Sequence, residues 1–305
     1  MFNDDIKDYK EVFDKMVDFT KDYIIENNLR SAVIGISGGI DSTVVAALLH
    51  EASMLVPRDQ QFKVYGYSLP TNTTNEKEYL VSTWVGDAFA DEFKVVNIND
   101  TAESISKFFN TDDSDVQSIK KYRDGNIKAR LRMMFLYDAA KAHRGFVVGT
   151  DNYTEMLLGF STIGGDALAD YMPIQYFWKT QVYRLADYLL KKYKEEDNLP
   201  AMNAMYQSIN LKPQDGLGIS TSDMDQIGAK NYFEVDDILQ TYERYDEYRN
   251  MGGHDTPEIK TQIFNDVTSL YGSISVRNVV MRREKNFKLK LPLEFIPDVE
   301  RYTLI

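Results

Sequence analysis

Hydrophobic and polar residues alternate along this chain in two patterns, one typical of buried strands and one typical of helices. Four short runs of apolar, largely β-branched residues predict strands covered on both faces: 32–36, 64–69, 93–98 and 146–149. Apolar residues at spacings of three and four predict helices that precede or separate these runs: 5–28, 43–53, 75–91 and 117–143. This alternation predicts an α/β fold, a doubly wound parallel sheet flanked by helices, Rossmann-like in its right-handed crossovers.

The second half of the chain predicts helices at 179–193 and 234–248. Residues 195–222 between them show no clear period and are punctuated by prolines and glycines. Irregular segments of this length are often functional, so we expect a lid here. The length is compatible with a single domain spanning 1–305, with this lid and a helical C-terminal extension.

Charge and hydropathy limit the partners. The formal net charge is −12 and the isoelectric point is about 4.8, which disfavours binding to nucleic-acid phosphates. No apolar run approaches the roughly 18 residues that a membrane span requires, and the acidic N-terminus lacks the basic region of a secretion signal. We therefore expect a cytoplasmic enzyme of small metabolites, with no nucleic-acid or membrane partner.

Cysteine is absent and histidine is rare. Without cysteine the chain has no disulfide, no thiolate zinc site and no cysteine nucleophile of the kind that a glutaminase needs. His50, His143 and His254 lie far apart in the sequence and form no i, i+4 pair. A histidine-based metal site is therefore disfavoured.

A glycine-rich run joins the first predicted strand to the helix that follows it: Ser37-Gly38-Gly39-Ile40-Asp41-Ser42. A strand that feeds such a turn into a helix points unpaired backbone N–H groups and the positive end of the helix dipole at one place, where an anion binds. Gly38 and Gly39 allow a phosphate to approach the backbone, and the two serines can donate hydrogen bonds. Asp41 would repel a bare phosphate, which is most simply explained by a Mg²⁺ ion held beside it.

Two better-known phosphate loops do not occur at this position. The run lacks the Gly-x-x-x-x-Gly-Lys-Ser/Thr pattern, and its glycines do not form Gly-x-Gly-x-x-Gly. Transfer of the γ-phosphate in the manner of a kinase is therefore disfavoured. The plain structural alternative is a tight strand–helix turn with an N-capping serine.

Three further runs follow in order: 125–133 (GNIKARLRM), 149–155 (GTDNYTE) and 159–170 (GFSTIGGDALAD). The run at 37–42 resembles the SGG-x-DS loop of the N-type ATP pyrophosphatases, which grips the two phosphates that leave together. In combination, the four runs resemble the NAD synthetase family over roughly residues 5–300. The resemblance implies the fold of that group and the ATP-dependent amidation of nicotinic acid adenine dinucleotide to NAD. The reaction would proceed through an acyl-adenylate and release AMP and pyrophosphate.

The resemblance also implies roles for individual residues. The residues implied in ATP binding are Ser37, Gly38, Gly39, Ile40, Asp41, Ser42, Thr150, Lys179 and Ser208. Asp41 and Glu155 would hold Mg²⁺, while Lys179 would neutralise the phosphates. The residues implied in binding the dinucleotide are Asn126, Arg130, Asp170 and Lys288. The residues implied in catalysis are Asp41, Lys179 and Asp166, the last of which would lie near the incoming ammonia.

Each of these side chains also has a structural interpretation. Arg130 could lie on a solvated helix face, and Asp166 and Asp170 could form turns beside glycines. Glu155 could be a plain helix-start acid. Lys179 could be a surface residue in the first turn of a helix, although a cation there opposes the helix dipole.

Two positions depart from the pattern of the family. Ile163 stands where the family usually has a substrate-contacting lysine, and Phe287 stands in place of the histidine of a His-Lys-Arg segment in which Lys288 keeps its type. The cations available to compensate are Lys290, Arg282 and Arg283. Two alternatives therefore stay open: an AMP-forming ligase of this fold with a different carboxylate acceptor, and a non-catalytic nucleotide-binding paralogue.

The resemblance finally implies cofactors and partners. ATP would be the co-substrate and Mg²⁺ the metal. Free ammonia is the expected nitrogen donor, because no cysteine glutaminase site is present. A homodimer is expected, and the apolar N-terminal helix at 5–28 is a candidate surface for it.

Overall fold

The computed structural model describes residues 2–109, 117–214 and 222–290. At its centre lies a four-stranded sheet in which all neighbouring strands are parallel, in the order β3-β2-β1-β4. The strands are β1 (Ser31–Gly35), β2 (Lys63–Ser68), β3 (Glu92–Val95) and β4 (Phe146–Val148). Because β2 and β4 lie on opposite sides of β1, the sheet extends in both directions from its first strand. The predicted parallel α/β sheet is confirmed.

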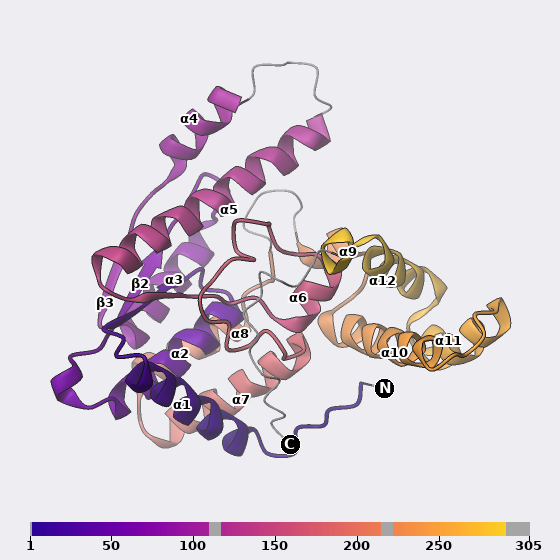
Figure 1. Cartoon of the computed structure of the whole chain (residues 1–305), viewed down its shortest axis with the longest axis horizontal. Coiled ribbons are helices and arrows are strands. Elements are labelled where there is room, and N and C mark those ends of the chain that lie inside the picture. Colours follow the sequence, from indigo (N-terminus) through magenta and orange to yellow (C-terminus); the bar gives the residue numbers. More distant parts are fainter. Residues whose placement is uncertain (1, 110–116, 215–221, 291–305) are drawn as a thin grey trace.

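Strand β1 explains why the predicted strands carry apolar residues at successive positions. Ala32 and Ile34 belong to one hydrophobic core, whereas Val33 belongs to a different core. Successive side chains of a strand point to opposite faces, so the sheet is buried on both faces at β1. The prediction of a fully covered strand is wrong for β3 at the edge, where Lys94 and Val95 are exposed. Helices cover the two faces in separate layers (Figure 1).

Five helices build the first of these cores: α1 (Tyr9–Glu26), α2 (Ile40–Leu55), α3 (Glu76–Phe89), α7 (Lys179–Glu195) and α8 (Leu199–Ile209). Helix α2 is central, since Val44 to Leu49 are at most 1% exposed. The apolar stripe of α1, which includes Phe13 and Met16, is buried against this core. The N-terminal helix therefore offers no free apolar stripe to a second subunit.

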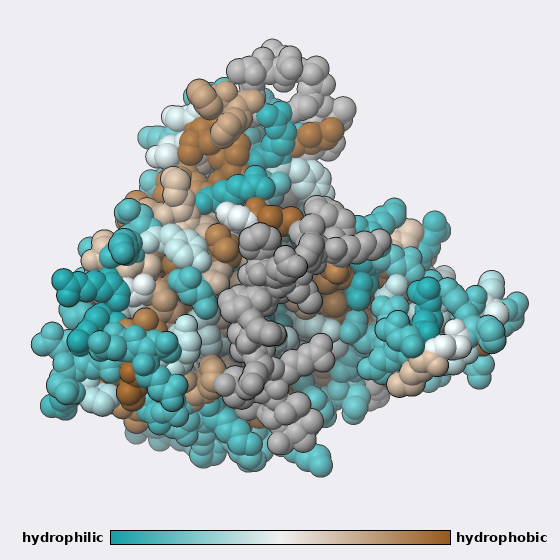
Figure 2. All heavy atoms as spheres, in the orientation of Figure 1, coloured by the Kyte–Doolittle hydropathy of each residue, from teal (hydrophilic) through white to brown (hydrophobic). Residues whose placement is uncertain are grey.

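Helices α4 (Asn99–Phe109) and α5 (Gln117–Ala142) cover the other face. Helix α5 matches the predicted helix at 117–143, whereas α4 is additional. Figure 2 shows hydrophobic side chains gathered over these two helices, at the top of the view. The exposed apolar residues there include Phe108, Phe109 and Met134.

Apart from α7 and α8, the helices in the second half of the chain form a helical layer beside the sheet (Figure 1). Its helices are α6 (Tyr153–Leu158), α9 (Asp223–Ile227), α10 (Tyr232–Asn250), α11 (Pro257–Tyr271) and α12 (Ser273–Lys285), with short 3-10 helices η1 (Arg58–Gln60) and η2 (Phe287–Lys290) elsewhere. These α-helices share a third hydrophobic core, centred on Val235, Ile238 and Leu239. The single-domain organisation stays a prediction. None of the described helices is long and apolar enough to cross a membrane.

The irregular conformation expected for 195–222 is wrong for residues 199–209. Residues 199–209 form helix α8, whose N-cap Asn198 accepts a hydrogen bond from the N–H of Ala201. Ala204 and Met205 are fully buried in the main core. Pro200 fits because a proline in the first helical turn loses no hydrogen bond. Residues 215–221 of the expected lid lie outside the described residues.

Candidate active site

The glycine-rich run forms the turn between β1 and α2 at the carboxyl edge of the sheet. Gly38 has a φ of +84°, and a Cβ there would lie 2.8 Å from the backbone nitrogen of Ser82. Only glycine meets both demands. Gly39 is the N-cap of α2 and has no side-chain cap, so the first N–H groups of this helix stay available to an anion. The alternative of a serine-capped structural turn does not describe this geometry.

Ser208 supports this turn through hydrogen bonds made outside the cavity. Its hydroxyl donates to the carbonyl of Gly38 at 2.8 Å and lies 2.7 Å from the hydroxyl of Thr43. Thr43 in turn donates to the carbonyl of Gly39 at 2.9 Å. Ser208 is 1% exposed and does not line the cavity in front of the loop. The structure therefore places it as a support of the phosphate loop, not at the predicted ATP-contact position.

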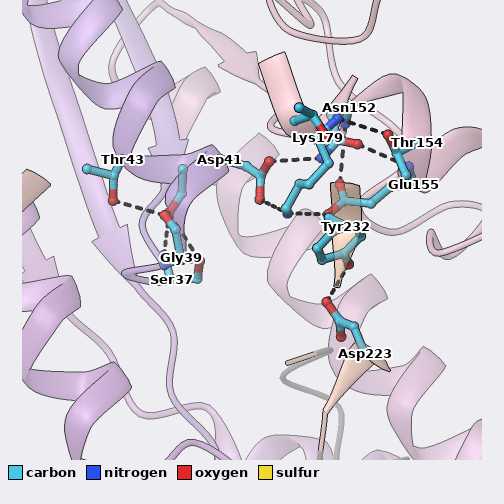
Figure 3. Close-up of polar contacts among 12 residues, drawn as sticks. Ser37, Gly39, Asp41, Thr43, Asn152, Thr154, Glu155, Lys179, Asp223 and Tyr232 are labelled. Carbon is cyan, nitrogen blue, oxygen red and sulfur yellow. Dashed lines mark hydrogen bonds and ion pairs between the residues drawn. The ribbon is translucent and has the colours of Figure 1, made fainter. Parts of the chain in front are cut away.

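Lys179 lies between two carboxylates beside the loop (Figure 3). Its ammonium is 2.5 Å from an oxygen of Asp41 and 2.8 Å from an oxygen of Glu155. The amide of Asn152 donates to the other oxygen of Asp41 at 2.8 Å. These residues come from the starts of α2, α6 and α7, so three helix N-termini converge at one position.

The start of α7 is fixed by a buried polar network. The backbone N–H of Lys179 donates to the hydroxyl of Thr154, and that hydroxyl donates to Asp236. The second oxygen of Asp236 accepts from the N–H of Thr180 at 2.7 Å. Burial raises the pKa of Asp236 to about 6, although these hydrogen bonds oppose the shift. Asp236 thus acts through other residues, holding Lys179 in place.

Burial and neighbouring charges shift the pKa values of both Glu155 and Lys179. Burial and the nearby Asp41 raise the pKa of Glu155 to about 7, against the opposing charge of Lys179. Burial lowers the pKa of Lys179, but Asp41 and Glu155 outweigh it and the net direction is well above the usual value. The ammonium is therefore charged, and the position between the carboxylates is suited to cations.

The protein supplies only some of the ligands that a Mg²⁺ ion at this position would need. Among the described residues, no group of three or more His, Cys, Asp or Glu side chains could hold a metal ion. Mg²⁺ is commonly bound by one or two carboxylates, with waters and substrate phosphates as its remaining ligands. Asp41 and Glu155 supply two carboxylates beside a phosphate loop, which matches that pattern.

The loop and the charged cluster open into one cavity of about 1080 Å³. Its walls come from the phosphate loop, the carboxyl ends of β2 and β4, the loop after α6, and helices α5, α9 and α12. Thr150 lines it directly after β4, as expected for the carboxyl edge of a parallel sheet. The volume is sufficient for more than one substrate, since small-molecule sites commonly measure about 300–1,000 Å³.

Helix α5 and the loop after α6 form the wall opposite the phosphate loop. Asn126 and Arg130 share one face of α5 and both line the cavity. Asn126 accepts from the hydroxyl of Thr162 at 3.0 Å, and Arg130 donates to the carbonyl of Ile163 at 3.1 Å. Arg130 is thus bound to the loop as well as exposed to the cavity.

Asp166 and Lys288 lie at the base of the same loop. One oxygen of Asp166 accepts from the N–H of Thr162 at 2.6 Å. The ammonium of Lys288 donates to the carbonyl of Gly159 at 2.8 Å and to that of Ser161. Both side chains line the cavity.

Asp170 is not brought to this cavity. One of its carboxylate oxygens accepts from the N–H of Val147 at 2.8 Å, and the other accepts from the hydroxyl of Tyr137 at 3.2 Å. The side chain is therefore engaged with β4 and α5 outside the cavity lining. The predicted contact with a dinucleotide has no support within one chain.

The charged lining residues that the sequence did not single out include Asp151 and Asp223, and the cavity is also lined by Arg282, which the sequence offered only as a replacement cation. Burial raises the pKa of Asp151 well above its usual value, with Asp166 as the next cause. Asp223 accepts from the hydroxyl of Tyr232 at 2.6 Å. The position of Asp151 within the 149–155 run was a usable signal, whereas Asp223 and Arg282 come from helices that only the tertiary fold brings here.

A parallel α/β sheet whose first turn is this glycine-rich loop, with carboxylates and a lysine beside it, defines the N-type ATP pyrophosphatase class of fold. The chain belongs to the NAD synthase family, whose family model matches residues 12–277.

Individual relatives agree with this assignment. The chain is 32% identical to an NH(3)-dependent NAD(+) synthetase from Thermoplasma volcanium over 234 residues, which cover 77% of this chain and 84% of the relative. It is 31% identical to the protein of the same description from Trichlorobacter lovleyi over 280 residues, with 91% and 87% covered.

Solved structures share the fold. An NH3-dependent NAD synthetase from Campylobacter jejuni superposes with a TM-score of 0.61 at 25% identity, covering 93% of this chain and 98% of that one. The NMN synthetase from Francisella tularensis gives a TM-score of 0.66 at 23% identity, with 93% and 96% covered. At that identity the second comparison supports the fold alone.

Proposed function

We propose that this chain catalyses the ATP-dependent amidation of nicotinic acid adenine dinucleotide to NAD, with ammonia as the nitrogen donor. The single observation that carries the proposal is the Lys179 cluster beside the phosphate loop, opening into the cavity that the loop at 159–166 also lines. A phosphate-activating centre and an acceptor wall thus share one space. The family and its relatives of about 30% identity supply the acceptor.

In the first half-reaction the nicotinate carboxylate attacks the α-phosphate of ATP, forming an acyl-adenylate and releasing pyrophosphate. The backbone N–H groups at the start of α2 bind the leaving phosphates, and the ammonium of Lys179 stabilises the charge that develops on them. Asp41 and Glu155 would hold Mg²⁺, which when bound neutralises phosphate charge and orients the leaving group. No side-chain nucleophile is required, so the rate acceleration comes from positioning and electrostatics.

In the second half-reaction ammonia attacks the acyl carbon and displaces AMP. Asp166 faces the cavity from the acceptor wall and is assigned to the ammonia side of the site. Its carboxylate accepts a hydrogen bond from the adjacent loop and has further acceptor capacity for the N–H groups of an incoming ammonia, which releases one proton as the amide forms. Asn126, Arg130 and Lys288 contact the acceptor from the same wall.

The two alternatives are not favoured. A non-catalytic paralogue would have no use for Lys179 held between Asp41 and Glu155 at the phosphate loop. A different acceptor class would have to explain why relatives that cover most of the chain are NAD synthetases.

The test is a product assay with purified protein, ATP, Mg²⁺, ammonium and nicotinic acid adenine dinucleotide, in which NAD, AMP and pyrophosphate are quantified. Equimolar NAD and AMP are expected, with a loss of about 10²- to 10³-fold in rate for Asp41→Asn. The matched control is Asp59→Asn, which changes an exposed aspartate in η1. AMP and pyrophosphate without NAD would instead indicate another acceptor, and the absence of ATP cleavage would exclude an enzyme of this kind.

We also propose that the protein is a cytoplasmic homodimer. The exposed apolar residues of α4 and α5, including Phe108 and Met134, support a subunit contact on that face. Light scattering is expected to give twice the chain mass for the wild-type protein and a shift to monomer for Met134→Glu. Met251→Glu is the control, because Met251 is 86% exposed after α10, away from this face. A wild-type monomer would contradict the proposal.

A further inference from the structure

We propose that Arg282 binds the phosphate of the nicotinate nucleotide and supplies the positive charge that Ile163 does not. The inference rests on the proposed function, because it names the group of the acceptor that one wall of the cavity recognises. Arg282 lies on α12 and lines the cavity. It is one of three cations that the sequence offers as a replacement, and the structure distinguishes between them.

The guanidinium of Arg282 is held in a fixed orientation. Its Nε donates to the carbonyl of Leu158 at 3.1 Å, and its central carbon lies 4.0 Å from the ring centroid of Phe160. Stacking on an aromatic ring together with one backbone contact restricts a side chain that otherwise has much rotamer freedom. In the described part of the chain, the two terminal nitrogens have no hydrogen-bond or ion-pair partner.

Arg282 is also a half-buried cation with no carboxylate at ion-pair distance among the described residues, although Asp223 acts on it from further away. Burial lowers the pKa of its side chain. A desolvated charge without a partner is unfavourable, and an anion that enters the cavity relieves that cost. The planar fork of a guanidinium matches the oxygens of a phosphate, which two parallel hydrogen bonds can join.

The neighbouring arginine shows the opposite arrangement. Arg283 lies 3.4 Å from an oxygen of Glu243 and 3.6 Å from an oxygen of Asp246. These two carboxylates neutralise its charge within the protein, and it is absent from the cavity lining. Arg283 cannot replace the missing lysine and provides a matched control. The side chain of Lys290 lies outside the described residues.

The position of Arg282 suits the acceptor better than ATP. It contacts the end of α6, one turn beyond Glu155 at the start of that helix, and it stacks on the loop that carries Ile163. A nicotinate nucleotide must direct its carboxylate towards the phosphate loop, where ATP is attacked. Its own phosphate then lies further along the cavity wall, where Arg282 and Lys288 flank the loop after α6.

Steady-state kinetics of the wild-type protein, Arg282→Gln and Arg283→Gln test the proposal, with nicotinic acid adenine dinucleotide and nicotinic acid mononucleotide as acceptors. For Arg282→Gln we expect the KM of the acceptor to rise by about 10- to 100-fold, with kcat and the KM of ATP nearly unchanged. Arg283→Gln is expected to match the wild type. Phe160→Leu keeps the charge but removes the stack, and its KM for the acceptor is expected between those two.

Nicotinic acid riboside, which lacks the phosphate, identifies the group that is recognised. It is expected to inhibit the wild-type protein and Arg282→Gln with equal potency. Three results would each overturn the assignment to the phosphate. Arg282→Gln could weaken inhibition by the riboside as much as it raises the KM of the acceptor, it could raise the KM of ATP equally, or it could leave the KM of the acceptor unchanged. If the wild-type protein amidates neither nucleotide, the proposed function fails first, and this inference fails with it.

Discussion

The ammonium of Lys179 lies 2.5 Å from a carboxylate oxygen of Asp41, although 138 positions separate the two residues in the sequence. Asp41 stands in the first turn of α2 and Lys179 begins α7. A cation at a helix start opposes the helix dipole, so the carboxylates around Lys179 must offset that cost. The pair therefore stabilises the start of α7 and also holds a positive charge beside the phosphate loop.

Lys179→Met is expected to lower kcat by about 10²- to 10³-fold, because it removes a positive charge from the leaving phosphates. The same change leaves Asp41 and Glu155 close together without a cation, which is expected to reduce the free energy of unfolding by about 3–5 kcal/mol. Mg²⁺ should restore part of that loss by binding between them. Thermal unfolding of the variant should therefore respond to Mg²⁺ more strongly than that of the wild type, and EDTA should abolish the difference.

Lys192→Met is the control for this experiment. Lys192 also lies between two carboxylates, 2.8 Å from Glu51 and 3.0 Å from Glu196, but outside the cavity. Its replacement is expected to leave kcat and the response to Mg²⁺ unchanged. Equal responses to Mg²⁺ in both variants would contradict a metal position at Asp41 and Glu155.

Gly38→Ala is expected to destabilise the protein by about 2–5 kcal/mol and to abolish ATP binding. About 1–2 kcal/mol comes from the left-handed backbone, and the rest from a Cβ that would meet the first two turns of α3. Gly252→Ala has a similar φ, +89°, with nothing within 4 Å of the new Cβ. In chemical denaturation, Gly252→Ala should reduce the free energy of unfolding only by the backbone contribution. Equal reductions for Gly38→Ala and Gly252→Ala would argue against the close approach of α3.

Ser208→Ala is expected to reduce the free energy of unfolding by about 1–2 kcal/mol, since the Gly38 carbonyl loses a buried donor. The KM of ATP should change little, because the hydroxyl does not line the cavity. Ser53→Ala, which removes a hydroxyl bonded to the carbonyl of His50, serves as a control away from the loop. A rise in the KM of ATP of tenfold or more, without loss of stability, would restore Ser208 as a direct ATP contact.

The stability contribution of Asp236 is expected to depend on pH. Its pKa is about 6 in the folded protein against a usual value of 3.8. Between those values the unfolded chain has already lost the proton that the folded state retains, so stability falls as pH rises through this window. The loss approaches about 3 kcal/mol above pH 6.

Asp236→Asn should remove that slope from the free energy of unfolding measured by denaturant titration between pH 4 and 7. Asp59→Asn, an exposed substitution, reports the pH dependence of all other groups. Parallel pH profiles for the wild type and Asp236→Asn would disprove the raised pKa.

Residues 199–209 form a helix that the sequence pattern did not predict. This segment contains proline, asparagine and serine, which suggest an irregular loop, yet it folds as α8 because Ala204 and Met205 are buried against the main core. Asp170 shows the same limit at a single position. Its place in a motif predicted substrate contact, whereas its carboxylate binds the backbone of Val147.

The sequence by itself determined the parallel sheet and the phosphate loop, since both depend on local patterns: apolar runs of strand length, and two glycines and an aspartate at a strand–helix turn. Only the tertiary structure decided which distant side chains meet. Lys179 reaches Asp41, Ser208 stays behind the loop, and Arg282 rather than Arg283 faces the cavity. The physical reason is that burial and charge pairing depend on how the helices pack, and a sequence pattern does not contain that geometry.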